Sequence, residues 1–184
     1  MPEPSGDAGA DIAGMVAAGL RDVPDFPQPG IMFKDIAPLL ADGPSFSRAI
    51  RALADHARAC GPLDLVAGVE ARGFLVAGAL ARELDSGLVA VRKAGKLPPP
   101  TLRRSYDLEY GSAELEVPMG ILQGTRVFLV DDVLATGGTL RAAADLLVQA
   151  GASVTGLGVL LEIGFLGGSG RLHPVAAVHA LLRS

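Results

Sequence analysis

The sequence predicts an α/β protein with a mostly parallel central sheet that is covered by helices on both faces. Two observations lead to this prediction. Short, largely apolar runs alternate with helical periodicities along the chain, and the run LDLVAGV (63–69) is apolar almost throughout rather than at every second residue. Strands buried on both faces have this composition, and parallel neighbours need a crossover between them. A length of 184 residues suits one domain over 1–184.

Five apolar runs mark the strands of the predicted sheet: 63–69, 88–93, 126–133, 153–162 and 175–182. Apolar residues at helical spacing follow the first and third runs, namely Phe74, Ala77, Ala81 and Leu84, then Leu140, Ala143, Leu147 and Ala150. Two earlier helices are expected, one near 11–20 and one that opens at Pro44 and Ser45. Parallel strands joined by helices imply right-handed crossovers.

Three segments depart from this alternation. Residues 1–10 are rich in proline, glycine and acid and are expected to be loose, and residues 25–40 form a loop punctuated by prolines. Residues 94–120 are polar, and their stretches TLRRSYDLEY and AELEV can pair as a hairpin. An insertion of this length is usually functional or mobile. Both a flexible lid over a site and a passive surface hairpin fit its composition.

Composition narrows the classes of function. The net charge of −4 argues against a protein that binds nucleic acid through its phosphates. Cys60 is the only cysteine, so a disulfide within the chain and a CxxC metal site are excluded. No Lys or Arg precedes Arg21, and no apolar stretch reaches the roughly 18 residues of a membrane span. We therefore expect a cytoplasmic protein that does not act at a membrane.

The stretch VFLVDDVLATGGTL (127–140) carries the clearest chemical signal. Ligands of open parallel sheets bind beyond the carboxyl ends of the strands, where Asp131 and Asp132 are expected. The next helix begins after Ala135, Thr136, Gly137, Gly138 and Thr139. Helix N-termini suit phosphates, and glycines allow close approach of the backbone. The stretch therefore predicts a ribose 5-phosphate site, with the acids on sugar hydroxyls; solvated acids beside a plain turn are the alternative.

The same stretch resembles the phosphoribosyl-pyrophosphate signature of type I phosphoribosyltransferases. DFPQPGIMFKDIAPLL, GVEARGF, VRKAGKLPPPT, SYDLEYGSAELE and LLEIGFLGG are similar to the adenine phosphoribosyltransferase branch, in the family's order, across most of 25–168. The resemblance implies the type I fold with a small hood and a flexible hairpin lid. It also implies transfer of 5-phosphoribosyl from phosphoribosyl pyrophosphate to adenine, giving AMP and pyrophosphate in purine salvage, and a homodimer.

The resemblance assigns the leaving pyrophosphate to cations, namely Arg72, Arg92, Lys93 and Lys96. Arg72 is also assigned to catalysis, and part of the cluster reaches a neighbouring subunit's site in this family. A solvated basic run is the alternative for RKAGK. Mg²⁺ is the implied cofactor, held mainly by pyrophosphate, ribose hydroxyls and water, with Asp131 and Asp132 on the ribose directly or through metal-bound water. No dedicated protein cage is expected.

The resemblance places adenine against the ring of Phe33, with the backbone of Met32 and Lys34 reading its edge. The alternative is that Phe33 only fastens the loop to the core. Glu109 is the candidate general acid or base, and Tyr110 would seal the closed site. A glutamate has an ordinary pKa of about 4.3, so proton transfer needs a perturbed setting. The alternative is that Glu109 only orients the base or is an exposed strand acid.

Three other functions are alternatives to adenine phosphoribosyl transfer. The same chemistry on another 6-substituted purine or on a guanine-type base stays open. A regulator that binds DNA would need an extra winged-helix segment, and only about 25 residues precede the purine loop. A silent paralogue is disfavoured because Arg72, Lys96, Asp131 and Asp132 are present.

Overall fold

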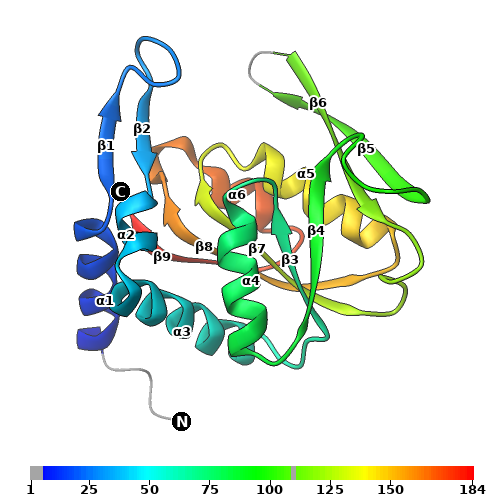
Figure 1. The fold of residues 1–184 in the computed structure, drawn as a ribbon, viewed down its shortest axis with the longest axis horizontal. Coiled ribbons are helices and arrows are strands. Elements are labelled where there is room, and N and C mark those ends of the chain that lie inside the picture. The colour runs from blue at the N-terminus through cyan, green and yellow to red at the C-terminus, as the bar shows by residue number, and fades with distance from the viewer. Residues whose placement is uncertain (1–5, 109–110) are drawn as a thin grey trace.

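The chain forms a seven-stranded sheet and a separate two-stranded hairpin (Figure 1). The structure is a computed structural model that describes residues 6–108 and 111–184. Five neighbouring strands of the sheet are parallel, and β9 forms one edge. Their order is β4 (Gly87–Lys93), β3 (Leu65–Val69), β7 (Arg126–Leu134), β8 (Ser153–Glu162) and β9 (Val178–Arg183). This confirms the predicted mostly parallel sheet.

Helices connect the parallel strands, as predicted. They are α4 (Gly73–Glu83) after β3, α5 (Gly138–Gln149) after β7, and the short η1 (Gly164–Leu166) and α6 (Gly168–Leu172) after β8. Two longer helices precede the sheet, α1 (Gly6–Ala18) and α3 (Gly43–Ala59). The Asp42 side chain caps α3 by accepting the amide of Ser45 at 3.2 Å, so this helix begins where proline and serine predicted it.

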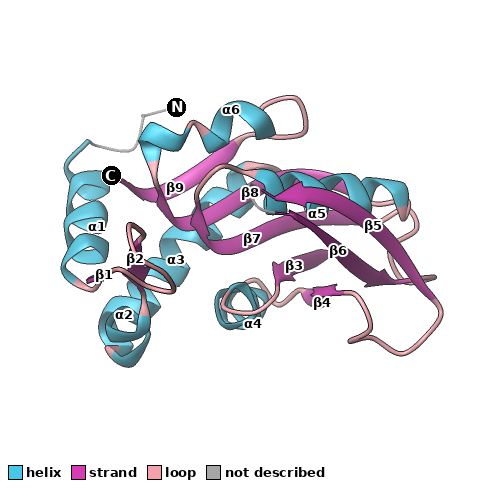
Figure 2. Ribbon diagram, turned by 90° about the horizontal axis from the view of Figure 1, so that it is seen from above, coloured by secondary structure: helices cyan, strands magenta, loops and turns pink. Residues whose placement is uncertain are grey.

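Both faces of the sheet are buried because helices pack on each of them, and successive side chains of a strand point to opposite faces. In β7, Phe128 and Val130 pack into a core with α1, α3 and α4, whereas Val127 and Leu129 pack into a second core with α5. All four side chains are fully buried. Figure 2 shows α4 and α5 on opposite sides of the sheet. Burial of each such side chain contributes about 1.5–3 kcal/mol, which explains the continuously apolar strands.

The prediction that 1–10 are loose was wrong for 6–10, which lie in α1; residues 1–5 are outside the described part. The helix is fixed further along by Val16, which is fully buried in the core. Residues 25–40 are not a loop throughout either. β2 (Met32–Asp35) pairs antiparallel with β1 (Arg21–Pro24), and α2 (Ala37–Ala41) follows. Asp35 joins these elements, since it accepts the Ala37 amide at 2.9 Å and pairs with Arg21 at 2.6 Å.

The predicted hairpin in 94–120 is present as β5 (Thr101–Leu108) and β6 (Gly111–Pro118). β6 also extends the main sheet, because it pairs antiparallel with β4 at Arg92 and Lys93. Leu115 and Val117 of β6 are buried in the core. The base of the hairpin is therefore part of the sheet, and motion as a lid stays a prediction for its outer part.

Two hairpins flank the edge at which the parallel strands end. In Figure 1, β1–β2 and the outer part of β5–β6 project from the same side of the molecule, with the ends of β3 and β7 between them. This arrangement frames an open site at the carboxyl edge of the sheet. Among the described residues, no helix has the length and apolar character needed to cross a membrane.

Candidate active site

The predicted sugar and phosphate groups meet two of the predicted cations, Arg72 and Lys93, at the carboxyl edge of the sheet, whereas Arg92 and Lys96 do not line the cleft. β3 pairs with both β4 and β7, so the residues that follow these strands lie together. One cleft is lined by Glu70, Ala71, Arg72, Lys93, Tyr106, Ala113, Leu115, Asp131, Asp132, Val133 and Thr139. A smaller hollow beside it is lined by Asp131 and by every residue from Val133 to Leu140. The two share Asp131, Val133 and Thr139, so they form one continuous site.

Glycine shapes the turn 135–139, the segment that comprises the turn after β7 and the first two residues of α5. This helix begins earlier than predicted. Gly137 has φ +82°, a conformation that side chains disfavour, and a Cβ built on it would lie 2.7 Å from the carbonyl oxygen of Gly168. Gly137 is also the N-cap of α5 and brings no side-chain oxygen to the amides of the first turn. A phosphate in the hollow can accept hydrogen bonds from these amides and gain from the helix dipole.

The acid pair at the end of β7 is incompletely neutralised. Asp132 is 4% exposed, and its Oδ2 lies 2.7 Å from Nε of Arg72 without a directed hydrogen bond to any described residue. Asp131 Oδ1 accepts the amide of Asp132 at 2.9 Å. Burial raises the pKa of Asp131 well above its ordinary value, and the neighbouring charge of Asp132 raises it further. The pair is therefore suited to bind hydroxyl donors or a cation.

Gly73, at the first position of α4, leaves room for this acid pair. A Cβ on Gly73 would lie 2.7 Å from Oδ1 of Asp131 and 3.3 Å from the carbonyl oxygen of Val130. The glycine of GVEARGF thus allows α4 to begin directly against the end of β7.

Arg72 joins the acid pair to the β1–β2 hairpin. Its guanidinium carbon lies 4.7 Å from the centroid of the Phe33 ring, and Nη1 donates to the carbonyl oxygen of Lys34 at 3.4 Å. Phe26 meets the same ring edge-on at 5.1 Å. Phe33 therefore lies next to the acid pair, with Arg72 between them.

The side chains of Met32 and Lys34, the other two predicted base-binding residues, do not point into the site. Met32 is 51% exposed, and Nζ of Lys34 pairs with Asp22 of β1 at 2.7 Å. Side chains alternate along β2, so Met32 and Lys34 point away from the face that carries Phe33. Only their backbone remains available to the side of Arg72, as the Lys34 carbonyl already illustrates.

The predicted cation cluster is organised by Glu70, which the sequence reasoning missed. Glu70 Oε2 accepts Nε of Arg92 at 3.2 Å and the amide of Lys93 at 3.0 Å. Burial raises the pKa of Glu70, but the Lys93 amide and Arg92 outweigh it and hold the pKa below its ordinary value. Arg92 also donates from Nη1 to the carbonyl oxygen of Lys96 at 3.2 Å. Arg92 is thus occupied within the chain, whereas Lys93 and Lys96 are exposed and Lys93 lines the cleft.

Tyr106 is a second residue that the sequence reasoning did not select. Its hydroxyl oxygen lies 3.4 Å from Oγ1 of Thr139, which links β5 to the phosphate turn. Tyr110, which is predicted to seal the closed site, and Glu109, the predicted general acid or base, both lie outside the described residues.

Metal ligands are sparse in this site. Within 6–108 and 111–184 no group of three or more His, Cys, Asp or Glu side chains is placed to hold a metal ion. Any divalent ion at the acid pair would therefore depend on oxygen atoms from a ligand or water, as magnesium commonly does. Oδ2 of Asp132 already pairs with Nε of Arg72 at 2.7 Å, so an ion at the acid pair would have to share this carboxylate with Arg72.

Comparison with known proteins agrees with this geometry. Residues 39–179 match the family model described as the phosphoribosyl transferase domain. An adenine phosphoribosyltransferase from Mycolicibacterium gilvum is 55% identical over 173 residues, 93% of this chain and 95% of the relative. One from Kineococcus radiotolerans is 57% identical over 171 residues, 91% of this chain and 92% of the relative.

Solved structures lead to the same group. Adenine phosphoribosyltransferase from Rhodothermus marinus has a TM-score of 0.90 and 43% identity, covering 95% of this chain and 99% of its own. The Saccharomyces cerevisiae enzyme, complexed with an imino-altritol bisphosphate and adenine, has a TM-score of 0.87 and 36% identity, covering 94% and 99%. The chain therefore belongs to the phosphoribosyltransferase family, in its adenine phosphoribosyltransferase branch.

Proposed function

We propose that this cleft transfers the 5-phosphoribosyl group of phosphoribosyl pyrophosphate to adenine, giving AMP and pyrophosphate in purine salvage. The observation that carries the proposal is the turn 135–139, with its uncapped helix N-terminus, directly beside the incompletely neutralised acid pair. One phosphorylated sugar spans both features. The choice of adenine as the acceptor is supported by the relatives described above, which are all named adenine phosphoribosyltransferases.

Each end of the sugar has its own partner in this proposal. The 5-phosphate accepts hydrogen bonds from Ala135, Thr136, Gly137, Gly138 and Thr139. Asp131 and Asp132 accept the ribose hydroxyls. Two fixed ends hold the anomeric carbon in one place, and such positioning contributes to the rate by removing the entropy of alignment.

The pyrophosphate leaves as the bond from its oxygen to the anomeric carbon breaks, and the new bond from N9 of adenine forms. Arg72, Lys93 and Lys96 offset the charge that develops on the leaving oxygens. Arg92 holds the backbone of Lys96 by donating a hydrogen bond to the Lys96 carbonyl oxygen. Mg²⁺, when bound with the substrate beside the acid pair, would be held mainly by pyrophosphate oxygens, ribose hydroxyls and water, and it would add positive charge on the pyrophosphate.

Adenine stacks on Phe33 in this proposal, and the backbone at Met32 and Lys34 reads its edge. Arg72 covers one face of the Phe33 ring at 4.7 Å, so a move of Arg72 onto the pyrophosphate would uncover that face for the base. Adenine also loses a proton as N9 bonds to the sugar. We assign that proton to Glu109, with Tyr110 closing the site over it.

The remaining organisation follows from the same assignment. One domain spans 1–184, with β1–β2 as the hood over the base and the outer part of β5–β6 as the lid. We propose a homodimer in which part of segment 92–96 reaches the partner's site. Light scattering of the active enzyme tests this, because a fully active monomer would contradict shared sites.

The experiment that tests the function is an assay of pyrophosphate release with adenine, hypoxanthine, guanine and xanthine, with and without Mg²⁺. We expect release that requires Mg²⁺ and has the highest kcat/KM with adenine. Faster turnover of hypoxanthine or guanine would overturn the choice of base. Absence of pyrophosphate release with every purine would overturn the activity itself.

A further inference from the structure

The loop between β4 and β5, residues 94–100, is wound around one buried carboxylate. Glu116 of β6 is 0% exposed. Its Oε1 accepts the amides of Lys96 at 2.6 Å and Leu97 at 2.7 Å, while Oε2 accepts Nε of Arg103 at 3.1 Å and the hydroxyl of Thr101 at 3.3 Å. All four contacts come from the loop or from β5, so a single side chain fixes the connection between the two strands.

The peptide units of Lys96 are held on both sides. Its amide donates to Glu116, and its carbonyl oxygen accepts Nη1 of Arg92 at 3.2 Å. Arg92 is itself held by Glu70, which also accepts the amide of Lys93. Two carboxylates thus fix the backbone of both exposed lysines, and neither lysine side chain is used to do so.

Glu116 is ionised in this setting. Burial raises the pKa of Glu116, but the amides of Leu97, Lys96 and Gly95 and the charge of Arg103 outweigh it and lower the pKa to about 2. Hydrogen bonds to a charged acceptor are roughly twice as strong as neutral ones, and an unpaired buried amide is costly. The charge of Glu116 is therefore what keeps the amides turned inward and the lysine side chains outward.

Glu116 does not touch the cleft, which is lined in β6 by Ala113 and Leu115. We propose that Glu116 is a positioning residue for the pyrophosphate half of the reaction, because it fixes segment 95–97 so that Lys96 points toward the leaving group. The inference rests on the proposed function, in which Lys96 binds pyrophosphate. It predicts that the loss of Glu116 harms binding of phosphoribosyl pyrophosphate and spares binding of AMP, which has no pyrophosphate.

The test is Glu116→Gln, with both affinities measured by calorimetry on the full chain. The amide keeps the size and one acceptor oxygen but loses the charge, so we expect about tenfold weaker binding of phosphoribosyl pyrophosphate. AMP affinity and KM for adenine should be unchanged. The matched control is Asp64→Asn, since Asp64 also accepts a backbone amide and a guanidinium but lies at the amino end of β3. The control should leave both affinities unchanged.

Two results would overturn the inference. One is unchanged affinity for phosphoribosyl pyrophosphate in folded Glu116→Gln, and the other is an equal loss for both ligands. If the variant does not fold, hydrogen exchange of the wild type decides: the amides of Lys96 and Leu97 should exchange as slowly as strand amides, and rapid exchange would refute the anchor. A wild type that binds neither ligand would instead refute the proposed function. The exchange measurement would still test whether Glu116 fixes segment 95–97.

Discussion

The two ends of the parallel strands use the same charged side chains in opposite ways. At the amino edge, Asp64 precedes β3 and Arg126 begins β7. Asp64 Oδ2 accepts the amide and Nε of Arg126 at 2.8 and 2.9 Å, and Oδ1 accepts Nη2 at 2.7 Å. Every charge in this pair is met by its partner, so nothing there calls for a ligand.

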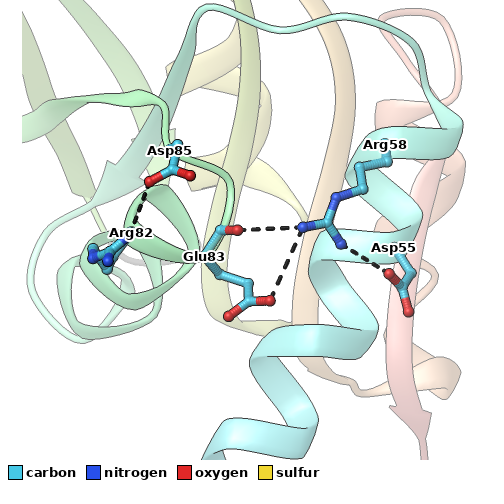
Figure 3. A network of polar contacts seen from close by, with 5 residues as sticks. All are labelled: Asp55, Arg58, Arg82, Glu83 and Asp85. Atoms are coloured by element: carbon cyan, nitrogen blue, oxygen red, sulfur yellow. Dashed lines mark hydrogen bonds and ion pairs between the residues drawn. The ribbon is translucent and has the colours of Figure 1, made fainter.

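The ends of α3 and α4 continue this pattern on the surface (Figure 3). Arg58 of α3 pairs with Asp55 at 2.9 Å and donates to the carbonyl oxygen of Glu83 at the end of α4. Arg82 pairs with Asp85 at 2.8 Å. Exposed pairs of this kind contribute about 0–1 kcal/mol each. These pairs neutralise the charges at the ends of α3 and α4 and leave no carboxylate there that needs a ligand.

At the carboxyl edge, two adjacent acids share one arginine. Asp132 is nearly buried and has an oxygen without a directed hydrogen bond, and the pKa of Asp131 is raised by burial and by its neighbour. Such an arrangement costs folding free energy that a bound ligand can recover. The contrast lies in the number of charges: Asp64 has its own arginine, whereas two adjacent carboxylates at the carboxyl edge have Arg72 alone between them.

The strongest way to break the comparison is Asp131→Asn. Removal of one carboxylate relieves repulsion, so we expect a higher melting temperature without ligand. The same change removes an acceptor for the ribose, so kcat/KM for phosphoribosyl pyrophosphate should fall by about a thousandfold. Differential scanning calorimetry and the pyrophosphate-release assay measure the two effects.

Asp64→Asn is the matched change at the amino edge. It removes the charge of a fully paired acid, so the melting temperature should fall by a few degrees while kcat/KM stays at the wild-type value. The comparison would fail if both variants moved stability in the same direction, or if Asp64→Asn lowered kcat/KM.

A smaller effect is expected from Gly137→Ala in the phosphate turn. The new Cβ would lie 2.7 Å from the carbonyl oxygen of Gly168, and φ of +82° is unfavourable for alanine. The turn must shift, so we expect affinities for AMP and phosphoribosyl pyrophosphate to fall together by about a hundredfold. Isothermal calorimetry with each ligand measures this.

Gly124→Ala is the control at the other edge, because Gly124 has φ +75° and no atom within 4 Å of the added Cβ. It should cost about 1 kcal/mol of folding free energy and no affinity. Equal affinities for wild type and Gly137→Ala would show that the phosphate does not bind on this turn.

The sequence was most informative where structure is local. The run 126–133 and the turn 135–139 are contiguous, so apolar composition and glycine spacing were enough to predict a strand, a turn and a helix N-terminus at one edge. β1 was not predicted because it has four residues with no apolar run, of which only Val23 is partly buried. Its pairing with β2 is supported by contacts such as Lys34 with Asp22. Those contacts depend on tertiary placement.

The same limit applies within the site. Glu70, Tyr106 and Glu116 act through partners on other elements, and the pairing of β6 with β4 that brings Glu116 under the cation segment is invisible in the sequence. The base-binding roles of Met32, Phe33 and Lys34 and the proton transfer by Glu109 stay predictions. They depend on a bound purine and a closed lid rather than on the fold.

The smallest expected effect is on how the free energy of unfolding changes with pH. It compares the acid pair with a pair of stacked histidines. His56 of α3 stacks on His179 of β9 with ring centroids 3.9 Å apart. Sγ of Cys60 lies 3.6 Å from Nε2 of His56. Burial lowers the pKa of His56 to about 4, helped by the charge of His179. Between about pH 4 and 6.5 the unfolded chain therefore binds a proton at His56 that the folded chain does not, so the free energy of unfolding falls as the pH falls.

Asp131 has the opposite sign. Its raised pKa means that the folded chain takes up a proton at a higher pH than the unfolded chain does, which adds stability as the pH falls. In urea unfolding at a series of pH values from about 7 to 4.5, His56→Gln should flatten the decline in stability and Asp131→Asn should steepen it. If His56→Gln kept the wild-type slope, the histidine pair would not be a source of acid sensitivity, and the contrast between the two pairs would be wrong.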